Sequence, residues 1–386
     1  MPHHHDATAP LAATLHGSFS EIAANDWNGL LARQSLPTPF LRWEFLNTLE
    51  ETACTHAETG WLPLPMSVRD AQGELVGAAP LYAKGHSYGE FVFDWAWAEA
   101  YERAGLRYYP KLLVASPFSP IPGTRLLTQS PSARAALIEA LETQVAQSGM
   151  SSAHVLFADA NDIAALSDRG WLIRENVQFH WMNHGYAVFA DYLARLTQPK
   201  RKKINAERRK VREAGVTTRV VHGAEITPAL WDFFFKCYTT TYREHHSTAY
   251  LTRECFLRLA ACMPDTFVLS LAERNGTPIA SALLMQDNGV LYGRYWGAVE
   301  RVDCLHFEVA YYRPIEWAIS RGIARFEGGA QGEHKLARGF EPVVTHSAHW
   351  LSEPRFRDAV ARFLERESNG IGRYVNELEA RSPVRT

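Results

Sequence analysis

Two stretches of equal length decide the fold: "FADANDIAALSDRGWLIRENVQFHW" at residues 157–181 and "FEGGAQGEHKLARGFEPVVTHSAHW" at residues 326–350. Aligned at a constant offset of 169 residues, both begin with phenylalanine, carry an Arg-Gly-aromatic triplet and end in His-Trp. Identities that keep one register over 25 residues indicate an internal duplication. The triplets are Arg169-Gly170-Trp171 and Arg338-Gly339-Phe340.

The residues around each copy predict the same order of elements. A helical pattern ending in glycine precedes each copy, at 131–149 and 306–322. Three strand candidates in the second half are separated by "RNG" and "DNG", which are strong hairpin signals, and 65–84 has a similar pattern in the first half. We therefore expect a mixed α/β fold with two tandem domains. The expected segments are a disordered leader at 1–10, domains at 11–185 and 186–386, a basic helix at 199–214 and a terminal helical segment at 358–380.

Composition excludes several classes of protein. The 40 basic and 42 acidic residues give a net charge of −2, so overall charge does not indicate a nucleic-acid or membrane partner. The five cysteines form no C-x-x-C pair, which argues against a disulfide framework or a zinc ribbon and predicts no metal site. We find no signal-peptide pattern and no run of about 18 apolar residues, so a cytoplasmic protein without a membrane span is expected.

A local cluster of positive charge stands out against this balance. Residues 200–212 contain eight cations and one acid, Glu207, on a predicted helix. One interpretation is a solvated helix face. The other is a docking surface for an anionic donor such as tRNA or a lipid pyrophosphate, although the run lacks aromatic residues for base stacking. The predicted docking residues are Lys200, Arg201, Lys202, Lys203, Arg208 and Arg209.

The helical stretch at 305–319 contains a candidate general base. Glu308 would share a helix face with Tyr311 and Tyr312, and burial beside tyrosines would raise its pKa. Attack by an amine requires loss of a proton, which such a carboxylate can accept. The alternative is an acid stabilised by the helix macrodipole, with His306 near the cap. Pro314 should kink the helix.

The loop after residue 326 contains a second group of candidates. In the first copy, Ile163-Ala164-Ala165-Leu166 stand where the second copy has Gly332-Glu333-His334-Lys335. Shared residues therefore indicate scaffold, and unshared polar residues indicate a site that only the second copy has. The predicted catalytic residues are Glu308, Glu333 and Lys335. The predicted substrate-binding residues are His306, Tyr311, Tyr312, Glu327, Gly329, Gln331, Gly332, His334, Gln178 and Asn183, the last two at an inter-domain groove.

Several stretches resemble a known family. The order of meander, long helix, strand, short helix, "GF" and final strand is similar to the GNAT acyltransferase fold, and a tandem pair resembles the FemAB architecture. The closest likeness is to a FemAB-like family of predicted N-acyltransferases of the peptidoglycan biosynthesis or recognition type. The stretches that carry it are "HSYGEFVFDWAWAEAYERAGLRYYPKLL" (86–113), "SPFSPIPGTRLL" (116–127), "QFHWMNHGY" (178–186), "KRKKINAERRKV" (200–211), "LHFEVAYYRPIEWAI" (305–319) and "GAQGEHKLARGFEPVVTHSAHW" (329–350).

This resemblance implies an acyltransferase that moves an acyl or aminoacyl group onto an amine. Direct attack by the amine is expected, because the sequence offers no convincing nucleophile for a covalent intermediate. The acceptor would be a small molecule or a cell-wall precursor. GNAT enzymes hold acetyl-CoA on a glycine-rich loop, but "ERVDCLHFEVAYY" (300–312) lacks those glycines, which argues against acetyl-CoA and is compatible with aminoacyl-tRNA or another acyl carrier as the donor. No cofactor is certain. The alternatives are a non-catalytic protein that binds a peptidoglycan precursor or RNA, and a CoA-dependent N-acetyltransferase.

Overall fold

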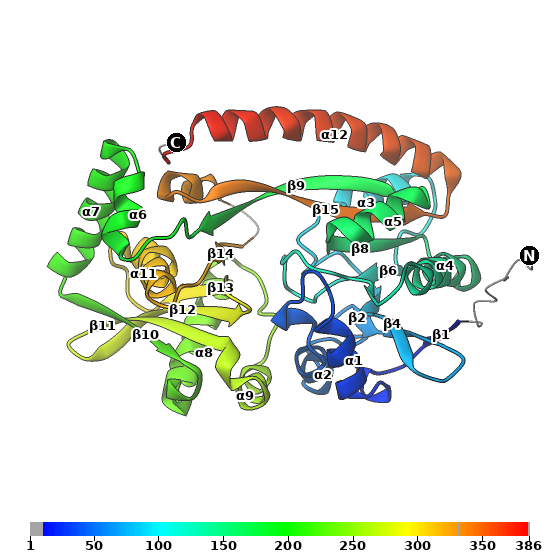
Figure 1. The fold of residues 1–386 in the computed structure, drawn as a ribbon, viewed down its shortest axis with the longest axis horizontal. Coiled ribbons are helices and arrows are strands. Elements are labelled where there is room, and N and C mark those ends of the chain that lie inside the picture. The colour runs from blue at the N-terminus through cyan, green and yellow to red at the C-terminus, as the bar shows by residue number, and fades with distance from the viewer. Residues whose placement is uncertain (1–10, 330–331, 385–386) are drawn as a thin grey trace, which may run out of the picture. The chain divides into compact units, whose positions relative to one another are not determined.

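The computed structural model describes residues 11–329 and 332–384, where the chain forms two compact units (Figure 1). Unit 1 comprises Met1–Phe118, Pro122–Glu175 and His346–Ser368, and unit 2 comprises Ser119–Ile121, Asn176–Thr345 and Asn369–Thr386. Neither unit is continuous in sequence. The predicted limits 11–185 and 186–386 therefore stay a prediction about the duplicated halves, and the predicted leader 1–10 lies outside the described residues.

Unit 1 is built on a mixed sheet covered by a long helix. Its strands follow the order β2-β5-β6-β8-β15, in which β6 and β8 are parallel, and a smaller sheet has the order β1-β3-β4-β7. Leu137 and Leu141 of α4 pack with Val155 of β8 in the core. The elements are β1 Ala12–Leu15, η1 Phe19–Glu21, α1 Ala24–Leu31, η2 Pro39–Leu41, α2 Trp43–Glu51, β2 Trp61–Pro63, β3 Met66–Arg69, β4 Leu75–Ala79, β5 Leu81–Lys84, α3 Trp95–Arg103, β6 Lys111–Val114, β7 Leu127–Thr128, α4 Pro131–Ser148, β8 Ser152–Ala158 and α5 Ala160–Asp168.

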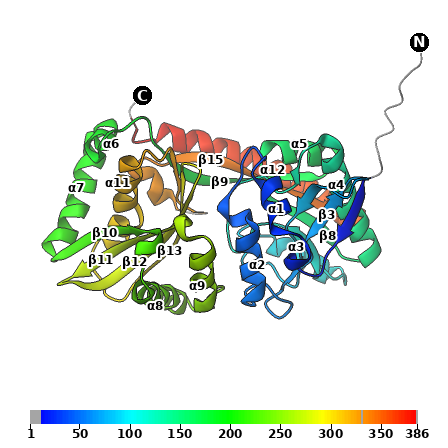
Figure 2. The ribbon, with the colours of Figure 1, turned by 60° about the horizontal axis from the view of Figure 1, so that its bottom comes forward.

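Unit 2 has a sheet in the order β10-β11-β12-β13-β14-β9. Helix α8 packs on one face of this sheet and α11 lies on the other, as Figure 2 shows. The elements are β9 Leu172–Met182, which starts in unit 1, α6 Phe189–Arg195, α7 Gln198–Glu213, β10 Val216–His222, η3 Gly223–Glu225, α8 Pro228–Glu244, α9 Arg253–Cys262, η4 Pro264–Thr266, β11 Phe267–Arg274, β12 Thr277–Asp287, β13 Val290–Ala298, α10 Leu305–Phe307, the π-helical turn η5 Glu308–Tyr312, α11 Arg313–Ser320, β14 Arg325–Glu327, the 3₁₀ helix η6 Glu333–Arg338, β15 Glu341–Leu351 and α12 Pro354–Ala380.

Most of the predicted elements are confirmed. The "RNG" and "DNG" hairpins join β11, β12 and β13, and Asn275 and Asn288 have φ of 51° and 46° while the following glycines have φ of 76° and 74°. Two consecutive residues with positive φ are what a type I′ turn requires. The predicted basic helix is α7, and the predicted terminal helical segment is α12.

The duplication is visible in the backbone. Strands β9 and β15, Leu172–Met182 and Glu341–Leu351, begin and end 169 residues apart. The turn before each strand has the same hydrogen bonds: Trp171 N donates to Leu166 O, and Phe340 N donates to Lys335 O. Gly170 and Gly339 have φ of 79° and 72° in these turns. The Arg-Gly-aromatic triplet therefore encodes a helix end that only glycine closes without strain.

The two long strands explain why the units are discontinuous. Strand β9 begins in unit 1, and its last residues pair with β14 in unit 2. Strand β15 begins in unit 2, and its last residues pair with β8 in unit 1. Each unit is thus completed by the end of a strand that starts in the other.

In the described ranges, no helix is long and apolar enough to cross a membrane. Within the same ranges, no group of three or more His, Cys, Asp or Glu side chains is arranged to hold a metal ion.

Candidate active site

Unit 2 contains a pocket of about 500 Å³ beside the start of α10. Its wall includes Thr241 of α8, Trp296 near the end of β13, and Cys304, His306 and Phe307. The pocket lies at the carboxyl end of β13, whose Trp296 and Ala298 line it; β13 pairs in parallel with β14 over Val290–Tyr292 and continues beyond that pairing to Ala298. An opening at the carboxyl end of parallel strands is a common position for ligand sites in α/β folds.

Two backbone features form the wall of this pocket. A Cβ at Gly297 would lie 2.2 Å from the carbonyl oxygen of Cys237, so glycine is what allows α8 to pack closely on β13. Cys304 has a φ of 67°, a left-handed conformation that turns the chain directly into α10. These residues fix the direction in which α10 presents the next side chains.

The helix that follows is not regular. Residues Glu308–Tyr312 form a π-helical turn, and α11 begins with Arg313 and Pro314. Proline lacks the N–H that a regular α-helix would need at this position, which accounts for the interruption predicted there. The wider turn separates the side chains of Glu308, Tyr311 and Tyr312, which a regular helix would place on one face. Tyr311 O–H lies 3.1 Å from Nε2 of His334, whereas Tyr312 donates to Glu207 of α7.

Four predicted site residues do come together: His306, Tyr311, His334 and Lys335. The His306 ring lies 5.4 Å from the Tyr311 ring and 6.1 Å from the His334 ring, measured between centroids. Lys335 Nζ donates to the carbonyl oxygen of Gly329 at 3.0 Å. The structure therefore brings residues from α10, η5 and η6 together in one polar cluster, in which Tyr311 and Lys335 are buried, His306 is half-buried and His334 is exposed.

Burial controls the charges in this cluster. Desolvation, helped by the charges of His334, Arg338 and Lys335, lowers the pKa of His306 to about 4. Burial, with Lys335 and Arg338 nearby, also lowers the pKa of His334. Burial lowers the pKa of Lys335 to about 8. At neutral pH the cluster thus has neutral imidazoles beside a lysine that is still mostly protonated.

The glycines of the 326–340 loop make room for these side chains. A Cβ at Gly328 would lie 3.1 Å from Cδ of Lys335, and one at Gly332, where φ is 117°, would lie 2.4 Å from the His334 ring. The following helix η6 is a six-residue 3₁₀ helix in which Lys335 N already donates to Gly332 O. Close approach of a ligand to this backbone stays a prediction, and Gln331 lies outside the described residues.

The three predicted acids lie in different surroundings. Arg208 holds Glu308 through Nε and Nη2 at 3.0 Å each, and burial raises the pKa of Glu308 against this pairing. Glu327 is buried, with Arg325 at 2.9 Å and His180 Nε2 at 4.0 Å. Glu333 is half exposed and accepts a hydrogen bond from Tyr374 of α12 at 2.8 Å. Their predicted roles stay predictions.

The two residues predicted at an inter-domain groove bond to backbone within unit 2. Gln178 Nε2 donates to Pro120 O at 2.8 Å, and its Oε1 lies 3.3 Å from Nε2 of His180. Asn183 Nδ2 donates to Ile323 O, while its Oδ1 accepts from the N–H groups of residues 185 and 186. These contacts stabilise loops, and a ligand role for Gln178 and Asn183 stays a prediction.

Helix α7 divides its charges between two faces. Ile204, Glu207 and Val211 are buried. Arg208 also faces inward, where its guanidinium binds Glu308 and Glu316 and lies 4.6 Å from the Phe189 ring centroid. The exposed face contains Lys202, Lys203 and Arg209, with Lys200 and Arg201 half-buried beside it. Of the six predicted docking residues, Arg208 is thus engaged with acids of its own unit.

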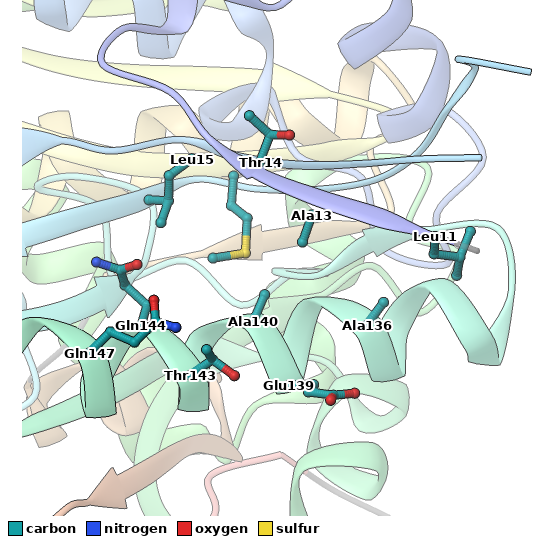
Figure 3. Close-up of a pocket in the computed structure, with 11 residues that line it drawn as sticks. Leu11, Ala13, Thr14, Leu15, Ala136, Glu139, Ala140, Thr143, Gln144 and Gln147 are labelled. Carbon is teal, nitrogen blue, oxygen red and sulfur yellow. The ribbon is translucent and has the colours of Figure 1, made fainter. Parts of the chain in front are cut away.

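A second pocket, of about 360 Å³, lies in unit 1 between β1 and α4 (Figure 3). Helix α4 contributes Ala136, Ala140 and Thr143, and the strand contributes Ala13 and Leu15. Small apolar and amide side chains with one carboxylate, Glu139, give this wall no evident acid–base chemistry. The pocket beside α10 in unit 2 is lined by titratable groups, among them His306 and Cys304. Trp296 and Thr241 also line it, but no sequence motif identified these two residues in advance. Gly297, one of two glycines inside strand β13, was the available signal.

Known structures share this architecture. The structure of FemX aligns with a TM-score of 0.56 at 10% identity and covers 90% of this chain and 99% of FemX. A domain assigned to a lysylphosphatidylglycerol synthetase from Agrobacterium fabrum aligns with a TM-score of 0.55 at 8% identity, over 90% of this chain and 96% of its own. L-PGS from Bacillus licheniformis has a TM-score of 0.50 at 11% identity, covering 86% and 98%. No curated protein matches the sequence.

The chain therefore shares its mixed α/β fold with FemX and with the two lysylphosphatidylglycerol synthetase structures. A family model described as peptidoglycan biosynthesis/recognition matches residues 18–386, and the chain belongs to this FemAB-like family. Membership makes the protein an acyl or aminoacyl transferase related to cell-wall metabolism.

Proposed function

We propose that the protein transfers an acyl or aminoacyl group from an activated donor directly to a primary amine of a cell-wall precursor, in the pocket of about 500 Å³ in unit 2. The observation that carries this proposal is the position of His306. This residue lines the pocket and also belongs to the polar cluster with Tyr311, His334 and Lys335. A neutral base in the wall of the cavity and a buried cation whose charge acts on that base suit attack by an amine on a carbonyl.

In the proposed step the amine nitrogen bonds to the acyl carbon, and the bond from that carbon to the donor's leaving group breaks. The attacking nitrogen must lose a proton, which His306 can accept because its pKa of about 4 keeps the ring neutral at physiological pH. The leaving group takes up a proton as it departs. Lys335, mostly protonated below its pKa of about 8, opposes the negative charge that develops on the carbonyl oxygen.

A covalent intermediate on Cys304 is disfavoured. This side chain also lines the pocket, but burial and the charge of Glu207 raise the pKa of its thiol. The thiolate is the nucleophilic form of cysteine, and a raised pKa depletes it at neutral pH. Direct attack by the acceptor therefore remains the mechanism that we propose.

The donor is proposed to be anionic, with aminoacyl-tRNA favoured over acyl-CoA. The exposed face of α7 presents Lys202, Lys203 and Arg209, and Arg208 connects the same helix to Glu308 of η5. Cations on a helix face attract phosphates in a salt-dependent way. Removal of Lys202 and Lys203 should reduce donor affinity and flatten its salt dependence.

The decisive experiment compares transfer with different donors. Purified protein is incubated with primary-amine cell-wall precursors and either charged tRNA or acyl-CoA, and the products are followed by mass shift. In parallel, muropeptides from a deletion strain are compared after complementation with wild type, with the double variant H306A/K335M, or with T143A in the unit 1 pocket as control. We expect a mass shift with one donor and rescue by wild type and T143A. Full rescue by H306A/K335M would refute the site.

A further inference from the structure

The duplicated Arg-Gly-aromatic turn has a different environment in each unit. In unit 1 the Arg169 side chain is 42% exposed and pairs with Glu142 at 2.6 Å. In unit 2 the Arg338 side chain is 4% exposed and pairs with Glu207 at 3.0 Å. The turns have the same hydrogen bonds, so the backbone does not require this burial. An exposed pair such as the first contributes little to stability, while a buried one restrains both partners.

The buried guanidinium of Arg338 holds three segments. Nη1 donates to the carbonyl oxygen of His334 at 2.7 Å, which restrains η6. Nη2 donates to Glu207 of α7 at 3.0 Å. The guanidinium also lies 3.4 Å from the centroid of the Phe307 ring, in α10. Its planar fork can satisfy these contacts together, which a lysine ammonium cannot.

These three segments are the ones that carry the proposed site. His334 and Lys335 are in η6, and His306 precedes Phe307 in α10. Glu207 accepts a second hydrogen bond from Tyr312, so the acid also restrains the π-helical turn that positions Tyr311. Tyr192 O–H donates to the carbonyl oxygen of Arg338 at 2.6 Å and fixes the end of η6. The first copy has no counterpart of His334 and Lys335, because alanine and leucine stand at 165 and 166.

We propose that Arg338 is a positioning residue of the transfer site, whose ion pair with Glu207 fixes the His334–Lys335 segment against α10 and α7. This inference rests on the proposed function. The conserved arginine of the repeat, which the sequence comparison assigned to scaffold, thus acquired a site role in the second copy alone. Arg169 keeps the scaffold role.

The experiment compares substitutions at the two equivalent arginines. R338M, R338K and E207Q are measured beside R169M as the matched control. Transfer is followed as kcat and KM, and folding is checked by denaturant unfolding. We expect R338M to lower kcat at least tenfold with KM within threefold, R338K to recover part of kcat, and R169M to stay within twofold of wild type. Equal effects of R338M and R169M would overturn the proposal.

A second readout does not need transfer activity. The imidazole signals of His306 and His334 are titrated by NMR, with H334Q used for assignment. Besides burial, the charges of Lys335 and Arg338 lower the pKa of His334. R338M should therefore raise the pKa of His334. E207Q keeps the guanidinium of Arg338 but weakens its ion pair with residue 207, and should therefore shift the His334 signals. If R338M does not fold, R338K and E207Q provide the same test.

Failure of this inference can be told from failure of the proposed function. If wild type transfers no group to any amine, the function fails, while the NMR titration of R338K and E207Q still tests whether Arg338 positions His334. If wild type is active and these variants leave kcat and the His334 signals unchanged, Arg338 is scaffold and the proposal is refuted.

Discussion

Lys111 of unit 1 and Lys335 of unit 2 are both buried, and these two lysines differ in what surrounds the ammonium. Lys111 of unit 1 is fully buried and bound to Glu90 at 2.8 Å, to Ser87 at 2.9 Å and to Asp94. Burial would lower the pKa of Lys111, but the charges of Glu90 and Asp94 outweigh it and raise the pKa. Lys335 of unit 2 donates to a carbonyl oxygen, and burial lowers its pKa to about 8. Paired carboxylates make a buried lysine structural, and desolvation makes it a candidate for chemistry.

The largest effect is expected from K111M. The substitution removes the ammonium that pairs with both Glu90 and Asp94, and Lys84, 4.0 Å away, remains beside Glu90. Breaking a buried ion pair in this way costs about 3–5 kcal/mol of the free energy of unfolding. Denaturant titration of K111M against wild type measures the loss, with the exposed K202M as control. A midpoint as high as that of wild type would show that Lys111 does not hold unit 1 together.

The variant K335M should behave in the opposite way. Methionine fills a similar volume and needs no desolvation of a charge, so the free energy of unfolding should be unchanged or higher. Transfer should fall at least about 100-fold, the usual range for loss of one group that stabilises a transition-state oxyanion. The mass-shift assay and a parallel denaturant titration measure the two effects. A large loss of stability with activity retained would make Lys335 a second structural lysine.

The pH dependence of stability should reveal Lys335 directly. The folded-state pKa of about 8 lies below the ordinary value of 10.5, so between these values the unfolded chain binds more protons. Stability attributable to this group therefore rises as pH increases through 8 toward 10.5, by about 1–2 kcal/mol up to pH 9.5. Denaturant unfolding at pH 7.5 and 9.5 should show this rise in wild type and lack it in K335M, in which all other groups titrate alike. Equal slopes in both proteins would contradict the lowered pKa.

The smallest effect is expected from E308Q. The amide retains the shape of the carboxylate, and Arg208 keeps its contact with Glu316, so a loss of about 1 kcal/mol is expected. Transfer should fall less than tenfold, because Arg208 already engages both carboxylate oxygens of Glu308, which leaves this carboxylate poorly placed to accept a proton from an acceptor amine. Steady-state kinetics of transfer by E308Q and by wild type measure this effect. A 100-fold loss with normal folding would support Glu308 as the base predicted from the sequence.

The sequence predicted the fold better than the site. Local signals such as Asn275-Gly276 and the duplicated Gly170 and Gly339 act over a few residues, and the structure confirms the turns they encode. Strands β9 and β15 each start in one unit and end in the other, and no local signal indicates this. The hydrophobic pattern of a strand is the same whichever partner strand it pairs with. This is why the sequence gives no indication that each compact unit is discontinuous.

For the site, the comparison of the two copies selected His334 and Lys335, which the structure brings together with His306 and Tyr311. It also assigned Arg338 to scaffold, because identity between copies cannot report a different environment for the same residue. Glu308 and Tyr311 seemed to share a face only under a regular helical period. The π-helical turn, which follows from the proline in the next turn, changes that period and directs Glu308 toward α7.

The exchanged strands also impose an order on synthesis. Strand β8 is made early, yet its antiparallel partner is the end of β15, almost 200 residues later in the chain. During synthesis, the edge of β8 in unit 1 therefore has no antiparallel partner until residue 351 has left the ribosome. Neither half of the duplicated sequence contains both members of the β8–β15 and β9–β14 pairs, so each half produced by itself would present these strand edges without their native partners.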